Sequence, residues 1–246
     1  MKRTTGAELD ALLAAALSPV AARARGSLSV GVRDLASGAR ALYGEGRRHD
    51  TASVVKVDIL AALLLAARDA GRELTAAERA LAAAMVERSD NDAATALWRA
   101  IGGPAGLDAA NARLGLTATR ADPGGAWGLT RTTAGDRLAL LGAVFGSGSA
   151  LDARSRAYLA DLMGRTVAGQ DWGVSAAGTG WALKNGWLPR SATGLWVVNS
   201  TGRVTAGGRG LLVAVLSDGH TTMAAGVTAV ESAARAAVRA VAGALG

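Results

Sequence analysis

Three short segments of this 246-residue chain carry side chains whose types and spacing suit acyl-transfer chemistry. The first is Ser53-Val-Val-Lys56, in which a serine stands three residues before a lysine. At the start of a helix, this spacing puts both side chains on one face, where the Lys56 amine can take the proton of the Ser53 hydroxyl. The same helix start points the Ser53 N–H toward a developing oxyanion. Since Ser-x-x-Lys also arises by chance, an ordinary helix start with a solvated lysine is the alternative.

Lysine usage singles out the same segment. Of the 27 basic residues, only Lys2, Lys56 and Lys184 are lysines. Arginine stays protonated in proteins, whereas a lysine can lose its proton and act as a base. A helix N-terminus and a second cation nearby both disfavour a charged amine. We therefore expect Lys56 to be uncharged, with Lys184 facing it.

The second segment is Ser89-Asp90-Asn91, which falls between two predicted helices. There the Ser89 hydroxyl can relay a proton to a leaving group, and the Asn91 amide can hold a substrate carbonyl. These residue types fit a helix N-cap equally well. This segment alone does not separate the two interpretations.

The third segment is Lys184-Asn185-Gly186, which we expect at the end of a strand. Lys184 offers a cation for a substrate carboxylate with Asn185 beside it, and Gly186 lets a ligand approach the backbone closely. The N–H of Trp187 would then be a second oxyanion donor. An ordinary strand running into a turn is the alternative.

The order of the three segments resembles the Ser-x-x-Lys, Ser-Asp-Asn and Lys-Thr-Gly motifs of the class A β-lactamases and the wider penicillin-binding protein and serine hydrolase superfamily. The resemblance implies an α+β, class A β-lactamase-like (DD-peptidase/β-lactamase) fold, with an antiparallel sheet flanked by terminal helices and an inserted helical lobe. It also implies a role for each motif residue. Ser53 would be the acylated nucleophile and Lys56 its general base, with Ser89 as proton relay and Asn91 as substrate-amide contact. Lys184 would be the carboxylate-binding cation with Asn185 and Gly186 beside it, and the N–H groups of Ser53 and Trp187 would form the oxyanion hole.

Two departures from that family affect the expected turnover. Class A β-lactamases place a glutamate between the second and third motifs to activate the deacylating water, whereas this chain has no glutamate between Glu87 and Glu231. Asp122 could hold such a water only if its loop runs close to Ser53, and we expect it instead to cap the Pro123-Gly124 turn. Loss of general-base assistance costs about 10²–10⁴ in rate, so we expect a persistent acyl-enzyme. Trp187 stands where the family carries a small residue, and its indole is expected to crowd the acyl pocket.

Hydrophobic periodicity predicts the elements that position these motifs. A β-hairpin is expected over 27–43, and further strands around Leu183, over 195–200 and over 210–216. Between the two sheet portions the period becomes helical. We expect one catalytic domain over 1–246, with an α/β part at 1–50 and 170–246 and a helical lobe at 51–169. The predicted helices are an amphipathic first helix containing Leu9, Leu12, Leu13 and Leu17, then 57–70, 76–87, 93–101, 106–114, 133–144 and 221–245.

Composition excludes several other kinds of site. With no cysteine there is no thiolate nucleophile, disulfide or zinc ribbon. The only histidines, His49 and His220, are interpreted as ordinary loop residues, which argues against a Ser-His-Asp triad. No cluster of metal ligands is evident, and the dyad needs no cofactor. The net charge of +7 is spread over scattered arginines with 4% aromatic residues, so nucleic acid is not an expected partner.

The chain start resembles a signal peptide only superficially. Met1-Lys2-Arg3 is basic, but Glu8 and Asp10 interrupt the apolar stretch that follows. No segment approaches the roughly 20 apolar residues needed to span a bilayer. The sequence does not fix the compartment, and the resemblance favours a location outside the cytoplasm, where related enzymes usually act. A monomer is expected.

The function predicted from these residues is a serine hydrolase or acyltransferase. It would form an acyl-Ser53 intermediate with amide or ester donors, of which β-lactams and peptidoglycan-type peptides are the classes implied by resemblance. One alternative is a binding or sensor module that traps an acyl group. Another is a degenerate scaffold in which Trp187 blocks the cleft.

Overall fold

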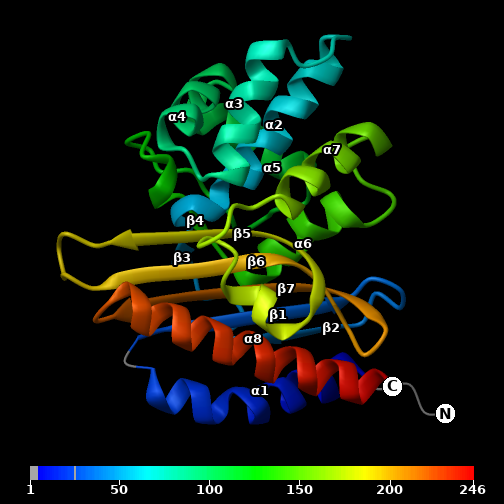
Figure 1. Ribbon diagram of the computed structural model, residues 1–246, viewed down its shortest axis with the longest axis vertical. Helices are drawn as coiled ribbons and strands as arrows, with labels where there is room; N and C mark the ends of the chain where they lie inside the picture. The colour runs from blue at the N-terminus through cyan, green and yellow to red at the C-terminus, as the bar shows by residue number, and fades with distance from the viewer. Residues whose placement is uncertain (1–4, 25) are drawn as a thin grey trace.

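A five-stranded antiparallel sheet forms the centre of the molecule (Figure 1). The computed structural model describes residues 5–24 and 26–246, so the basic start at Met1-Lys2-Arg3 lies outside the described residues. The strand order is β2-β1-β7-β6-β5, and every neighbouring pair is antiparallel. The strands are β1 (Leu28–Asp34), β2 (Arg40–Tyr43), β5 (Thr179–Pro189), β6 (Trp196–Ala206) and β7 (Arg209–His220).

Two terminal helices cover one face of this sheet, α1 (Gly6–Arg23) and α8 (Met223–Leu245) (Figure 1). Thr5 and Glu8 form a capping box that starts α1, which satisfies backbone N–H groups that the first turn leaves unpaired. Leu9, Leu13 and Leu17 recur every fourth residue and are buried against the sheet and α8. The predicted amphipathic first helix is thereby confirmed. Within residues 5–24 and 26–246, no helix meets the length and apolarity needed to cross a bilayer.

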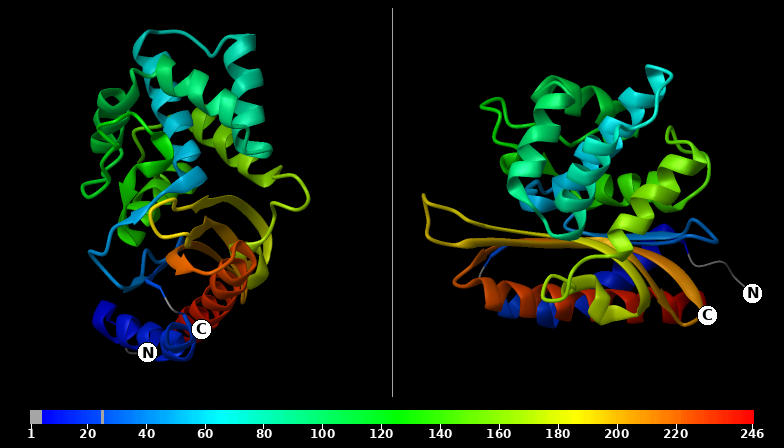
Figure 2. Two further views of the ribbon diagram at one scale, coloured as in Figure 1. Left: turned by 90° about the vertical axis from the view of Figure 1, so that its left-hand side faces the viewer. Right: turned by 45° about the horizontal axis from the view of Figure 1, so that its top comes forward.

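The opposite face of the sheet carries a helical lobe (Figure 2). Its central helix α2 is buried nearly all round, as expected of a helix enclosed by others. Together with the inner face of the sheet, the lobe forms a second apolar core. The lobe consists of α2 (Lys56–Asp69), α3 (Ala76–Glu87), α4 (Asn91–Ala100), α5 (Gly103–Arg113), α6 (Ala134–Phe145) and α7 (Ala153–Gly164).

Helix α7 and the short pair of strands β3 (His49–Asp50) and β4 (Arg131–Thr132) have no counterpart among the predicted elements. Helix α7 is rich in arginine and serine, so its apolar stripe is narrow: Leu159, Leu162 and Met163 are its buried apolar residues. Asp152 caps its start by accepting from the Ser155 N–H. The capping aspartate and the apolar residues at helical spacing were the sequence features that could have predicted this helix.

Neither histidine is an ordinary loop residue, contrary to prediction. His49 lies in β3, is buried, and bonds Ser29 Oγ at 2.9 Å and Asp218 Oδ2 at 3.1 Å. The hydrogen-bonded residues Ser29, His49 and Asp218 have the order of a catalytic triad, but Ser29 is fully buried and donates its hydroxyl to Gly44 O. We therefore interpret it as a structural tie between β1, β3 and β7. His220 is buried at the end of β7.

Candidate active site

Ser53 lies in a single 3-10 turn, η1 (Ala52–Val55), immediately before α2. The N–H of Lys56 donates to Ser53 O, so both residues share one turn of chain, as the motif predicts. Ala52 has φ of 46°, in the left-handed region. For a non-glycine residue this costs on the order of 1–3 kcal/mol and persists only where its surroundings hold it.

Asn199 holds the segment that leads to Ser53. Its Nδ2 donates to Asp50 O at 2.9 Å and to Thr51 O at 3.0 Å, and its Oδ1 accepts from the Ser217 N–H at 3.0 Å. The sheet is thereby tied to the backbone before η1. Sequence reasoning missed Asn199, because a single asparagine inside an apolar strand carries no motif.

Lys56 is buried, and its Nζ has three acceptors. These are Ser89 O at 2.6 Å, Ser89 Oγ at 3.1 Å and Asn91 Oδ1 at 2.8 Å. Ser89 reaches this position with φ of 57°, a second strained non-glycine residue. Asp90 caps α4 by accepting from the Ala93 N–H, so this segment is a helix cap as well as part of the cluster. Within the described part of the chain, Ser53 makes no side-chain hydrogen bond to Lys56.

Lys184 reaches the same serine hydroxyl from the sheet. Its Nζ donates to Ser89 Oγ at 3.0 Å and to Asn185 O at 3.1 Å, and its side chain is buried. Two lysine amines therefore meet on one hydroxyl. Of the predicted site residues, Lys56, Ser89, Asn91 and Lys184 are joined by these hydrogen bonds.

Enclosure of two amines makes their charged forms costly. Burial lowers the pKa of Lys56 to about 8, against the opposing effect of the Asp90 carboxylate. Burial and the Lys56 charge lower the pKa of Lys184 to about 7. Burial therefore lowers the pKa of both amines, and the Asp90 carboxylate opposes this effect at Lys56.

Gly186 brings β5 against the backbone of η1. A Cβ at this position would lie 2.6 Å from Ser53 N, 2.8 Å from Val54 N and 2.9 Å from Thr51 O. All three are backbone atoms, which cannot rotate away. Glycine at the third motif position is thus required by the approach of the strand to Ser53.

A Gly186→Ala substitution should consequently lower the rate of Ser53 acylation by about 100-fold, since a shift of about 1 Å in a reacting group has that effect. Stopped-flow measurement with a chromogenic acyl donor tests this. Gly243→Ala is the matched control, because a Cβ there meets no atom within 4 Å. An alanine at 186 that acylates at the wild-type rate would show that the contact does not position Ser53.

The structure does not bring the side chains of Asn185 and Trp187 to this cluster. The third motif lies in the middle of β5 rather than at its end, so its side chains point alternately to the two faces of the sheet. Asn185 Nδ2 donates to Gln170 O and Trp172 O, both at 2.8 Å. Trp187 packs into the core beside α1 and α8, with its ring centroid 6.0 Å from that of Trp172. The expected crowding by the Trp187 indole is wrong, because that indole is on the other face of the strand.

The loop between α5 and β4 approaches Lys56 through an aromatic ring. Trp127, in the turn η2 (Trp127–Leu129), has its ring centroid 4.9 Å from Lys56 Nζ. Asp122, the carboxylate of this loop, accepts from the Ala126 N–H at 3.1 Å. Asp122 thus caps its own turn, as predicted. Sequence reasoning did not identify Trp127.

A buried ion pair behind the site also escaped prediction. Asp58, two residues beyond Lys56 on α2, pairs with Arg137 of α6 through bonds of 2.5 Å and 2.7 Å, and both are buried. The signal was a lone carboxylate in the apolar stretch of α2. This pair ties α2 to α6 and so fixes the helix that carries Lys56.

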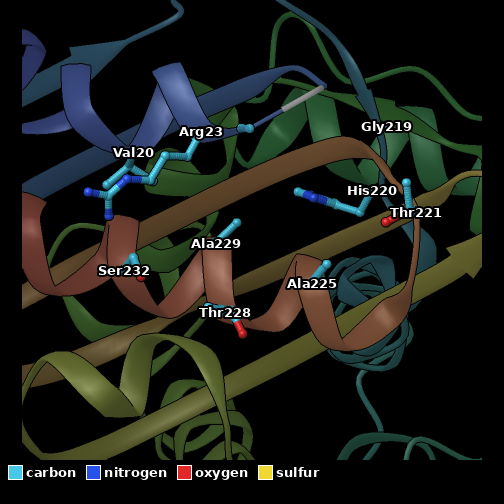
Figure 3. A pocket seen from close by; sticks show the side chains of 10 residues that line it. Val20, Arg23, Gly219, His220, Thr221, Ala225, Thr228, Ala229 and Ser232 are labelled. Atoms are coloured by element: carbon cyan, nitrogen blue, oxygen red, sulfur yellow. The ribbon is translucent and has the colours of Figure 1, made fainter.

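A cavity of about 400 Å³ between α1 and α8 is separate from this cluster (Figure 3). Val20, Arg23, His220 and Ser232 are among its lining residues, and none of the predicted site residues lines it. It lies on the sheet face opposite the helical lobe, so it is not the candidate active site.

Comparison with known proteins places this arrangement in a family. The family model described as the β-lactamase enzyme family matches residues 12–241. Comparison with curated proteins gives no significant match.

Solved structures of β-lactamases and of a penicillin-binding protein have the same fold. A PBP-A mutant in an acyl-enzyme complex with penicillin G is 23% identical, with a TM-score of 0.79 over 94% of this chain and 96% of that one. A β-lactamase from Xanthomonas campestris is 24% identical, with a TM-score of 0.76 over 95% and 98%. An ancestral class A β-lactamase is 26% identical, with a TM-score of 0.75 over 93% and 99%. With the predicted α+β, class A β-lactamase-like fold confirmed and the family model spanning most of its length, this chain belongs to the β-lactamase enzyme family of serine hydrolases.

Proposed function

We propose that this protein is a serine hydrolase or acyltransferase that forms an acyl-Ser53 intermediate with amide or ester donors and releases it slowly. The observation that carries the proposal is the meeting of two buried lysine amines on the Ser89 hydroxyl. Burying two cations beside each other is costly unless one gives up its proton. A structural role would be served better by apolar side chains, so the pair points to proton transfer.

In the proposed acylation, uncharged Lys56 takes the proton from Ser53 Oγ as this oxygen bonds to the donor carbonyl carbon. The N–H groups of Ser53 and Trp187 would hold the resulting oxyanion. The intermediate collapses with cleavage of the bond to the leaving group. The Lys56 proton then passes through the Ser89 hydroxyl to the departing nitrogen or oxygen.

Lys184 would recognise a carboxylate on the donor. Its amine has no carboxylate partner among the described residues, and its pKa is lowered to about 7. A bound carboxylate restores the proton on Lys184, and the new charge then disfavours a proton on Lys56. Donors with a carboxylate next to the scissile bond, such as β-lactams and peptidoglycan-like peptides, would therefore promote formation of the base. The exposed Asn91 amide would hold a carbonyl of the same donor.

Slow release follows from the lack of a base for water. The chain has no glutamate between Glu87 and Glu231, and Asp122 is engaged in its own turn. Loss of general-base assistance slows hydrolysis by about 10²–10⁴. A sensor that traps one acyl group is the second candidate, favoured by the same occupied Asp122.

Intact-protein mass spectrometry with penicillin G tests the proposal. We expect one added penicilloyl mass per chain within minutes, and product formation beyond one equivalent only slowly. Strict arrest at one equivalent over days would favour the sensor. If neither penicillin G nor an activated ester or peptide donor gives an adduct or any product, the proposed function is wrong.

A further inference from the structure

Trp127, in the loop between α5 and β4, lies beside the Lys56 amine. Its ring centroid is 4.9 Å from Lys56 Nζ, and its Nε1–H donates to Thr95 Oγ1 at 3.2 Å. Thr95 in turn donates to Asn91 O at 2.9 Å. The indole is thus fixed to α4, the helix that begins with Asn91, and its ring lies beside the Lys56 amine.

The turn that carries Trp127 also packs on the turn that carries Ser53. A Cβ built on Gly128 would lie 3.9 Å from Ala52 Cα, so η2 runs close to the backbone of η1. Trp127 is half-buried, and its remaining contacts are with the apolar core of the helical lobe. The hydrogen bond to Thr95 and this packing therefore anchor the ring beside Lys56.

Lys56 Nζ lies between three polar acceptors and an aromatic ring. Ser89 O, Ser89 Oγ and Asn91 Oδ1 lie within 3.1 Å of it, and the Trp127 ring centroid lies 4.9 Å away. Unlike a carboxylate, this ring neither positions a water nor accepts its proton. The loop that carries Asp122 thus places an indole, rather than this carboxylate, beside Lys56.

We propose that Trp127 slows hydrolysis of the acyl-enzyme, holding Lys56 in place and excluding water from the acyl group on Ser53. This inference rests on the proposed function, since it concerns the fate of the acyl-enzyme. Hydrolysis joins a water oxygen to the acyl carbon and breaks the bond from that carbon to Ser53 Oγ, which regains a proton from the water. In this proposal the Trp127 ring takes the place beside the amine where that water would lie.

The primary test compares the half-life of the acyl-enzyme after excess donor is removed. We expect Trp127→Ala to shorten it at least about tenfold, which corresponds to about 1.4 kcal/mol of the deacylation barrier. Trp127→Leu fills the space with an apolar side chain and should keep the half-life within about threefold of wild type. Trp181→Ala is the matched control, because Trp181 packs on the core at the other face of β5. An unchanged half-life in Trp127→Ala would overturn the inference.

A second readout separates this role from simple packing. An aromatic face favours the charged amine, so its loss in Trp127→Leu should move the pH midpoint of acylation down by about 0.5–1 unit. Trp127→Phe keeps a ring and should move it less. Equal midpoints in the leucine and phenylalanine variants would contradict the inference, even if Trp127→Ala failed to fold. Absence of any adduct on the wild-type protein would instead refute the proposed function.

Discussion

A Ser53→Ala variant is expected to form no covalent adduct with any acyl donor, the largest effect that the proposed mechanism predicts. The substitution removes the only oxygen that the mechanism acylates. Ser53 is half-buried and its hydroxyl has no hydrogen-bond partner in the described residues, so the fold should tolerate alanine. We expect the free energy of unfolding to change by no more than about 0.5 kcal/mol.

Intact mass and thermal unfolding of the same sample test this pair of expectations. Ser232→Ala is the matched control, since Ser232 lines the distant cavity beside α8 (Figure 3). It should be acylated like the wild type. An adduct that persists in a folded Ser53→Ala protein would mean that another residue is the nucleophile.

Replacement of Lys56 by methionine should lower the acylation rate by about 10²–10⁴, the usual contribution of a general base. The pH profile should change as well. Below its pKa of about 8 the wild-type amine is protonated and cannot accept the Ser53 proton. The wild-type rate should therefore rise about tenfold per pH unit up to pH 8 and then level off, and this rise should be absent in Lys56→Met.

The pH series needs an ester donor without a carboxylate. Burial lowers the pKa of Lys184 to about 7, so a carboxylate donor would also lose affinity as the pH rises. Lys56→Arg is a useful companion, because arginine keeps the charge but does not lose its proton. We expect it to be as slow as Lys56→Met. A variant that retained the wild-type rise toward pH 8 would assign the base to a different group.

Elements with strong local signals were predictable from the sequence. Helix α3 spans the predicted residues 76–87, because the Thr75–Glu78 capping box sets its start and apolar residues recur along one face. The β1–β2 hairpin was predicted from alternation around a glycine turn. The α+β fold followed from the order of such elements, together with the three motifs.

Features that depend on tertiary approach were not predictable. The polar residues at 184–186 were taken as the end of a strand, whereas β5 continues through them because each of them pairs with a residue of β6. This difference alone moves the Asn185 and Trp187 side chains to the opposite face. The contact between Trp127 and Lys56 depends on the path of a loop. Hydrophobic periodicity does not predict such a path.

The most direct test of the central claim is to locate the covalent bond. The protein is acylated with penicillin G, digested, and the modified peptide is sequenced by tandem mass spectrometry. The account predicts that the penicilloyl mass lies on Ser53, with Ser89 on the neighbouring motif unmodified. A bond to Ser89, or to a residue outside these two motifs, would contradict it.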